Sequence, residues 1–187
     1  MNADHLTLCS SAEWADALAR WIIPWALGDV ELGDRTVEFG PGPGLTTDVL
    51  RTMTGHLVSV ELDPELATAL TARMADADDV TVVHRSATDT GLPSGSATSV
   101  VCLTMLHHVP GLDIQDSLFR EARRLVGGDG VFAGSDNLDG PDFRALHHDD
   151  ICVPVDPVTL PQRLRDAGFD DVTVETNEWA VRFVARP

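Results

Sequence analysis

Positive charge is scarce in this chain of 187 residues, which has 13 Lys and Arg against 30 Asp and Glu and a formal net charge of −17. Proteins that bind nucleic acids through phosphates present clustered Lys and Arg. The composition therefore argues against a nucleic-acid partner, and it argues equally against an anionic membrane surface. We interpret the acidity as a source of solubility.

Cysteines and long apolar runs are also scarce. The three cysteines, Cys9, Cys102 and Cys152, are far apart and form no C-x-x-C pair, so we expect a reducing compartment and no disulfide framework. No apolar stretch approaches the length of a membrane span. The first residues include Asp4 and His5 and lack the basic and apolar regions of a signal peptide. We therefore expect a cytoplasmic protein that folds as one domain.

One glycine-rich stretch, TVEFGPGPGLTT, organises the chain. A short apolar run ends at Glu38 and Phe39, and Gly40, Gly42 and Gly44 follow before a segment compatible with a helix. Glycine permits a sharp turn and the close approach of a ligand, because it has no Cβ. A turn of this kind at the carboxyl end of a strand is where open α/β sheets bind nucleotide-like ligands.

The flanking residues discriminate between ligands. Dinucleotide sites need a third small residue where this chain has Leu45, and the carboxylate of Glu38 would repel a pyrophosphate. Pro41 and Pro43 remove two backbone donors that a phosphate would need. These features argue against a nicotinamide-dependent oxidoreductase and favour a ligand that carries an ammonium or a sulfonium.

The pattern acid-x-Gly-x-Gly-x-Gly from Glu38 to Gly44 resembles the first motif of class I S-adenosylmethionine-dependent methyltransferases. The resemblance implies S-adenosylmethionine as cofactor and S-adenosylhomocysteine as product. It also implies a Rossmann-like α/β fold, with a mostly parallel seven-stranded sheet, an antiparallel last strand and helices on both faces. The alternation of strand and helix patterns independently favours such a sheet. We expect one domain over residues 1–187, with a helical cap at 1–34 and the core at 35–187.

A second acid, Glu61, ends the next predicted strand, 21 residues after Gly40 (61 − 40). An acid so placed can bind the ribose diol, and the family resemblance assigns Glu61 this role. In the family a Gly-Asp-Ala sequence often contacts adenine, whereas this chain has Ser86 in place of the acid. Whether Ser86 or Asp89 contacts the adenine stays open. The residues predicted to bind the cofactor are Glu38, Phe39, Gly40, Gly42, Gly44, Glu61, Leu62, Ser86, Ala87 and Thr104.

The run from residue 97 to residue 103 is nearly all apolar, as expected of a central parallel strand buried on both faces. It leads to Thr104 and then to Leu-His-His-Val, which resembles many small-molecule methyltransferases of the class. By topology this segment borders the place where cofactor and acceptor meet. Because His titrates near neutral pH, we select His108 as the candidate catalytic residue. The alternative is that one of His107 and His108 packs and the other bonds locally.

Four potential metal ligands, residues 147–150, follow one another in a region that we expect to be irregular. Adjacent residues rarely converge on one ion, and no matching pair lies at helical spacing. We therefore expect no metal and interpret this segment as a mobile or substrate-side loop.

Several other segments have clear patterns. Ser10 or Ser11 is expected to cap a helix that runs to about Ala26, with Trp14, Leu18, Trp21 and Trp25 on one face. That face packs on the domain, walls the substrate pocket, or does both. We further expect Asp113 to cap a long helix, residues 127–130 to turn, and residues 131–135 to form the fifth strand. Residues 171–177 and 179–185 should pair as an antiparallel hairpin.

These observations favour a methyltransferase that acts on a small-molecule acceptor. One alternative is an rRNA or other nucleic-acid base methyltransferase, since the Gly-Pro-Gly loop also resembles that of rRNA adenine dimethylases. Those enzymes carry an Asn-x-Pro-Tyr/Phe motif where this chain has residues 104–107, and the chain contains no tyrosine. A second alternative is a cofactor-binding module without catalysis. We expect no nucleic-acid or membrane partner and leave a homodimer open.

Overall fold

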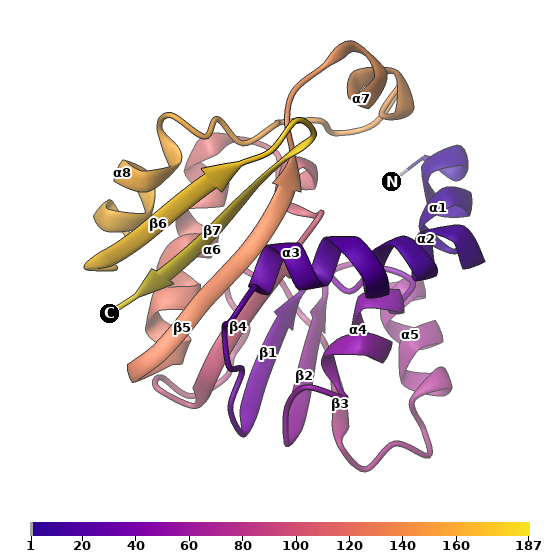
Figure 1. The fold of residues 1–187 in the computed structure, drawn as a ribbon. Coiled ribbons are helices and arrows are strands. Elements are labelled where there is room, and N and C mark those ends of the chain that lie inside the picture. Colours follow the sequence, from indigo (N-terminus) through magenta and orange to yellow (C-terminus); the bar gives the residue numbers. More distant parts are fainter. Residues whose placement is uncertain (1) are drawn as a thin grey trace.

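A computed structural model of the chain describes residues 2–187, and its centre is a seven-stranded sheet in the order β3-β2-β1-β4-β5-β7-β6 (Figure 1). The strands β1–β4 are parallel to one another and to β5, whereas β7 is antiparallel to both β5 and β6. The expected Rossmann-like sheet is thus confirmed. The strands are β1 (Arg35–Phe39), β2 (His56–Glu61), β3 (Val80–His84), β4 (Ala97–Leu103), β5 (Val126–Asn137), β6 (Asp171–Thr176) and β7 (Ala180–Arg186).

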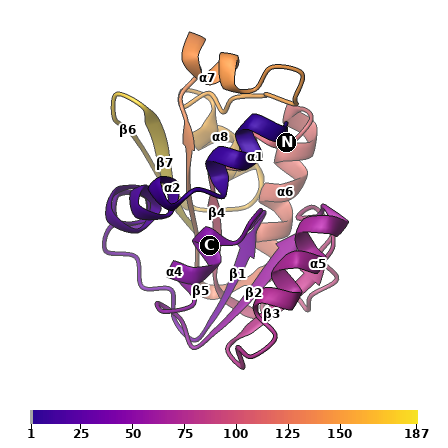
Figure 2. The same cartoon turned by 90° about the vertical axis from the view of Figure 1, so that its right-hand side faces the viewer.

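Helices cover both faces of the sheet (Figures 1 and 2). One face is packed by α2 (Ala12–Ala17), the π-helical η1 (Leu18–Ile22), α3 (Ile23–Leu27) and α4 (Leu45–Leu50), and the other by α6 (Leu112–Leu125) and α8 (Leu160–Asp166). The helix α5 (Pro64–Arg73) packs beside β2 and β3. Beyond the carboxyl ends of the parallel strands lie α1 (Ala3–Cys9), the 3-10 helix η2 (Leu106–His108) and α7 (Pro141–Leu146).

The central strand β4 joins the two hydrophobic cores. Val100 and Cys102 belong to the core beneath α6 and α8, and Val101 and Leu103 belong to the core beneath α3 and α4. All four side chains are buried. The prediction of a strand buried on both faces is confirmed, and this strand gives the site a rigid base.

The helix expected to run to about Ala26 is formed by α2, η1 and α3 and differs from the prediction because η1 is a π-turn. Ser11 caps it by accepting a hydrogen bond from Trp14 N at 3.1 Å. The π-helical segment from residue 18 to residue 22 inserts an extra residue into the helical repeat. Leu18 and Ile23 therefore face the core, while Trp21 is 71% exposed. The predicted apolar face was wrong at Trp21 for this reason.

Three other expectations need correction. The cap of α6 is Gly111, and Asp113 lies in the first turn, where its charge favours the helix dipole. The strand β5 begins at Val126, because residues 127–130, three of them glycines, form an irregularity in the strand rather than a turn before it. The helix α1 was not expected.

The terminal hairpin of β6 and β7 is confirmed. Within residues 2–187, no helix has the length and apolar character needed to cross a membrane. The cytoplasmic location and the division into a cap and a core stay predictions.

Candidate active site

A cavity of about 670 Å³ lies at the carboxyl ends of the parallel strands. Its wall comes from the segments that follow β1, β2, β3 and β4 and from α1, α2 and α6. The order of strands reverses between β1 and β4, and open α/β sheets bind ligands at such a switch point. The volume falls within the ~300–1,000 Å³ usual for small-ligand pockets.

The glycine loop after β1 has a backbone conformation that residues with a Cβ rarely adopt. Gly40, Gly42 and Gly44 have φ angles of +65°, +54° and +84°, all in the left-handed region. A Cβ on Gly40 would lie 2.8 Å from Met105 Cε, and one on Gly44 would collide with Leu70. Gly40 and Gly42 line the cavity, whereas Gly44 begins α4 and packs against α5.

Glu38 and Phe39 lie behind this loop rather than in the cavity wall. The carboxylate of Glu38 is 2% exposed and accepts hydrogen bonds from the hydroxyls of Thr46, Thr47 (2.7 Å) and Ser59 (2.7 Å). Burial raises the pKa of Glu38 because it penalises the charged form, although the three hydroxyls oppose this shift. A direct contact of Glu38 or Phe39 with the cofactor stays a prediction.

Glu61 lines the cavity and fixes the loop. One carboxylate oxygen accepts from Gly42 N at 2.9 Å, and the other accepts from Asp63 N at 2.9 Å. Each oxygen has a second lone pair, so the same carboxylate can also bind a ligand diol. The side chain of Leu62 beside it is 67% exposed and gives an apolar surface.

The segment after β3 separates the two candidates for the adenine contact. Ser86, Ala87 and Thr88 line the cavity, whereas Asp89 is exposed and outside the wall. Ser86 Oγ lies 2.7 Å from Thr88 Oγ1. Ser86 thus lies in the cavity wall and Asp89 does not, and Thr88 joins the wall without any signal in the sequence pattern. The adenine contact itself stays a prediction.

Thr104 follows β4 with a φ of +50° and lines the cavity. A β-branched residue in this region stores about 1–3 kcal/mol of strain, which persists where neighbours impose it. Its N–H donates to Ser135 O at 2.8 Å and keeps the backbone in place. Strained residues cluster at functional sites, and Thr104 lies where cofactor and acceptor are expected to meet.

The remaining wall is mostly apolar, with the indole of Trp14 and the imidazoles of His5 and His108. Trp14 lines it, as do Cys9 of α1, Leu18 of η1 and Ile114 of α6, which fits the pocket-wall interpretation of the tryptophan helix. Burial raises the pKa of the Cys9 thiol to about 11, so this thiol is protonated at neutral pH.

The two adjacent histidines after β4 differ in position. His108 lines the cavity, and burial together with the neighbouring His107 and His5 lowers its pKa to about 3. His107 lies outside the wall with its Nδ1 2.6 Å from Asp136 Oδ1. The catalytic role of His108 stays a prediction.

The sequence model of the methyltransferase-domain family matches residues 37–134, just over half of the chain. The chain belongs to this family of class I S-adenosylmethionine-dependent methyltransferases. Its cofactor is accordingly S-adenosylmethionine. The matched segment contains the glycine loop, Glu61, Ser86 and Thr104, and these parts of the methyltransferase line the cavity.

Solved structures share the methyltransferase fold. An S-adenosylmethionine-dependent methyltransferase from Aquifex aeolicus is 14% identical with a TM-score of 0.78, over 99% of this chain and 98% of that one. The DhpI–SAM–HEP complex is 18% identical with a TM-score of 0.75, over 99% and 92% of the two chains. At these identities the likeness establishes the fold alone.

Curated relatives match a shorter part of this methyltransferase. The ribosomal RNA small subunit methyltransferase A of Acidobacterium capsulatum is 44% identical over 71 residues, which are 37% of this chain and 24% of that protein. The protein of the same name from Lactiplantibacillus plantarum is 37% identical over 60 residues, or 32% and 20% of the two chains. The chain thus spans about a quarter or less of the length of these relatives.

Proposed function

We propose that this methyltransferase transfers a methyl group to a small-molecule acceptor. The observation that carries the proposal is the charge of the cavity wall. No Lys or Arg of the described chain lines it, whereas the wall includes Glu61, Asp63 and Glu65. This charge suits a cationic cofactor and opposes an RNA backbone, whose phosphates need basic side chains.

The far side of the cavity supports an acceptor of modest size and apolar character. Trp14 of α2 and Leu18 of η1 line this region together with Ile114 and Leu118 of α6. The imidazoles of His5 and His108 lie in the same wall. Pockets of this composition bind compact molecules through apolar contact and use a few polar groups for orientation. We therefore propose a largely apolar acceptor with a single nucleophilic atom.

The residues of the chain fit the cofactor. Gly40 and Gly42 line the cavity without side chains of their own, Glu61 offers lone pairs to a diol, and Ser86 offers a hydroxyl. The cofactor, when bound, supplies a methyl group already activated on a cationic sulfur. The task of the protein is then alignment, and correct orientation can lower a barrier by roughly 7–11 kcal/mol. Thr104, held in its strained conformation, would border the reacting atoms.

Methylation of rRNA bases is the second candidate, since the curated relatives with up to 44% identity carry that name. The net charge of −17 and the acidic cavity wall argue against it. A module that binds the cofactor without catalysis is the third.

Two measurements discriminate among the candidates. Calorimetry with S-adenosylmethionine, S-adenosylhomocysteine and NAD should detect binding of the first two only; binding of NAD alone would refute the assignment. Methyl-labelled cofactor is then offered with small-metabolite fractions and with ribosomal RNA. We expect label in small molecules, and label in RNA would decide for the second candidate.

A matched pair of tryptophan variants tests the acceptor side. Trp14→Ala should reduce methyl transfer and leave S-adenosylhomocysteine affinity unchanged, because Trp14 lines the cavity from α2 and not from the segments after β1, β2 and β3 that we expect to bind the cofactor. Trp21→Ala, on the same helix but 71% exposed, should change neither. Equal activity of the two variants would contradict the proposed acceptor wall.

A further inference from the structure

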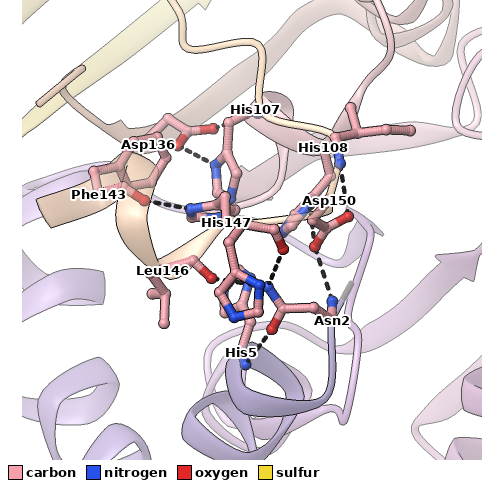
Figure 3. Close-up of polar contacts among 11 residues, drawn as sticks. Asn2, His5, His107, His108, Asp136, Phe143, Leu146, His147 and Asp150 are labelled. Atoms are coloured by element: carbon pink, nitrogen blue, oxygen red, sulfur yellow. Dashed lines mark hydrogen bonds and ion pairs between the residues drawn. The ribbon is translucent and has the colours of Figure 1, made fainter. Parts of the chain in front are cut away.

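Four histidines from three separate elements meet beside the cavity (Figure 3). His5 comes from α1, His107 and His108 form the end of η2, and His147 follows α7. Each offers one ring nitrogen, and the four nitrogens lie within 4.8 Å of one another. We propose that this four-histidine cluster binds one Zn²⁺ ion.

Three of these nitrogens are buried with no hydrogen-bond partner. They are His5 Nδ1, His107 Nε2 and His147 Nε2. A buried polar atom without a partner costs free energy, and native proteins contain few. Three such atoms in one place need a common partner, and a cation that accepts all three lone pairs is such a partner.

The opposite ring nitrogens of two histidines already have the partners that metal ligands usually have. His107 Nδ1 lies 2.6 Å from Asp136 Oδ1, and His147 Nδ1 lies 2.7 Å from Phe143 O (Figure 3). Ligand histidines commonly donate this second N–H to a carboxylate or a carbonyl. The two bonds place the proton on Nδ1 and leave the lone pair of each Nε2 directed at the cluster.

The charges around the cluster also suit a cation. Burial lowers the pKa values of His5, to about 4, and of His108, to about 3, and mutual repulsion adds to this effect. Neutral imidazole is the form that binds metal. Asp136 lies against His107, and Asp150 Oδ2 lies 3.8 Å from His108 Nδ1, so two carboxylates can balance a divalent ion.

Four imidazoles indicate a structural zinc site. Zinc in such sites is tetrahedral, with Zn–N bonds of ~2.0–2.1 Å and all four positions occupied by the protein, so the ring nitrogens would lie ~3.3 Å apart. In the structure the four ring nitrogens lie within 4.8 Å of one another, so the cluster needs to contract only slightly to bind the ion. A ring nitrogen bound to zinc cannot act as a base, and the proposal therefore replaces the catalytic role predicted for His108.

The ion would fasten α1 to the rest of the molecule. Asn2 already joins them, since its N–H donates to Asp150 Oδ2 and its Nδ2 donates to Leu146 O, both at 2.9 Å (Figure 3). His5 and His108 both line the cavity. On the proposed function, the ion would hold the acceptor wall closed.

The sequence pattern predicted no metal site among the adjacent residues 147–150. Of these four residues, only His147 belongs to the four-histidine cluster. The side chain of His148 is 57% exposed and lies outside it. His148 is therefore a matched control for His147, since it is the same residue type in the same segment.

The test uses the full chain without an affinity tag, stripped with a chelator and titrated with Zn²⁺ and Co²⁺. We expect one ion per chain and the strong visible absorption of tetrahedral Co²⁺. His147→Ala, His5→Ala and His108→Ala should each weaken zinc binding by at least ~100-fold, and Asp136→Asn should weaken it by ~10–100-fold. His148→Ala should bind zinc as the unsubstituted chain does.

Several results would overturn the site. The first is that the unsubstituted chain binds no zinc, and the second is that His147→Ala or His108→Ala leaves the zinc affinity unchanged. The third is a crystal of zinc-soaked protein that shows only water at the cluster and no anomalous zinc signal. The crystal and the titration need no variant, so a variant that fails to fold does not block the test. S-adenosylhomocysteine affinity is measured in parallel. If it persists without zinc binding, the metal site fails while the proposed function stands.

Discussion

The substitution Glu61→Gln tests the cofactor site most directly, because it preserves shape and removes charge. Both oxygens of Glu61 accept backbone hydrogen bonds at 2.9 Å, from Gly42 and Asp63. An amide has one oxygen, so its NH₂ must face one of these N–H donors. A hydrogen bond to a charged group contributes ~1.5–3 kcal/mol. We expect Tm to fall by ~3–12 °C at this chain length.

The same reasoning gives the loss of affinity. If Glu61 binds the ribose diol, the variant loses a further ~1.5–3 kcal/mol of binding, which is ~10–100-fold in Kd. Calorimetry should find this loss equally for S-adenosylmethionine and S-adenosylhomocysteine, because the ribose is common to both. Unequal losses would point to attraction of the sulfonium instead.

Glu65→Gln is the control, since it removes the same charge from an exposed side chain of the same cavity wall. Its affinity for both compounds should change by less than about twofold, as a screened surface charge contributes little. The reasoning is refuted if Glu61→Gln binds S-adenosylhomocysteine as tightly as the unsubstituted chain and melts at the same temperature.

Three other substitutions test the backbone and the buried acid. Gly44→Ala should lower Tm and cofactor affinity more than Gly91→Ala, measured by thermal melts and calorimetry, because both glycines have positive φ but only the Cβ at position 44 would collide with Leu70; equal effects would contradict this. Thr104→Asn should raise Tm by ~2–4 °C, since asparagine tolerates the left-handed region and relieves about 1 kcal/mol of strain; a lower Tm would show that the conformation costs little. Burial raises the pKa of Glu38, so the folded state binds this proton more tightly than the unfolded state does, and the stability of the native chain relative to Glu38→Gln should fall as pH rises from ~4.3 through the raised folded pKa. Denaturant melts across this range check the sign, and a relative rise would contradict it.

Local patterns in the sequence predicted most of the fold. The apolar run of β4 indicated a strand buried on both faces. The sequence Asp63-Pro64 is typical of a helix start, and Asp63 indeed caps α5 by accepting from Glu65 N and Leu66 N at 2.8 and 3.1 Å. The spacing of the glycines and of Glu61 pointed to residues that line the cavity, namely Gly40, Gly42 and Glu61, and their contact with the cofactor stays a prediction. These features depend on neighbours along the chain, which a sequence displays directly.

Features that depend on tertiary contacts were not predictable. The π-turn that exposes Trp21 is a property of how the helix packs, and no residue type specifies it. The positive φ of Thr104 has no signature in the sequence. His5 and His147 are separated by 142 residues (147 − 5), and only the folded chain brings them together.

The two sides of the cavity are formed by different parts of the sequence. Residues that face the expected cofactor lie within the single interval 40–104, whereas the opposite wall combines residues 5–18 with residues 105–118. Residues 5–18 and 105–118 can therefore diverge, or be exchanged with those of another member of the family, without altering the residues between 40 and 104 that face the expected cofactor. Changes in acceptor preference on this fold would therefore come mainly from substitutions at the start of the chain and just after β4, while residues 40–104 stay constant.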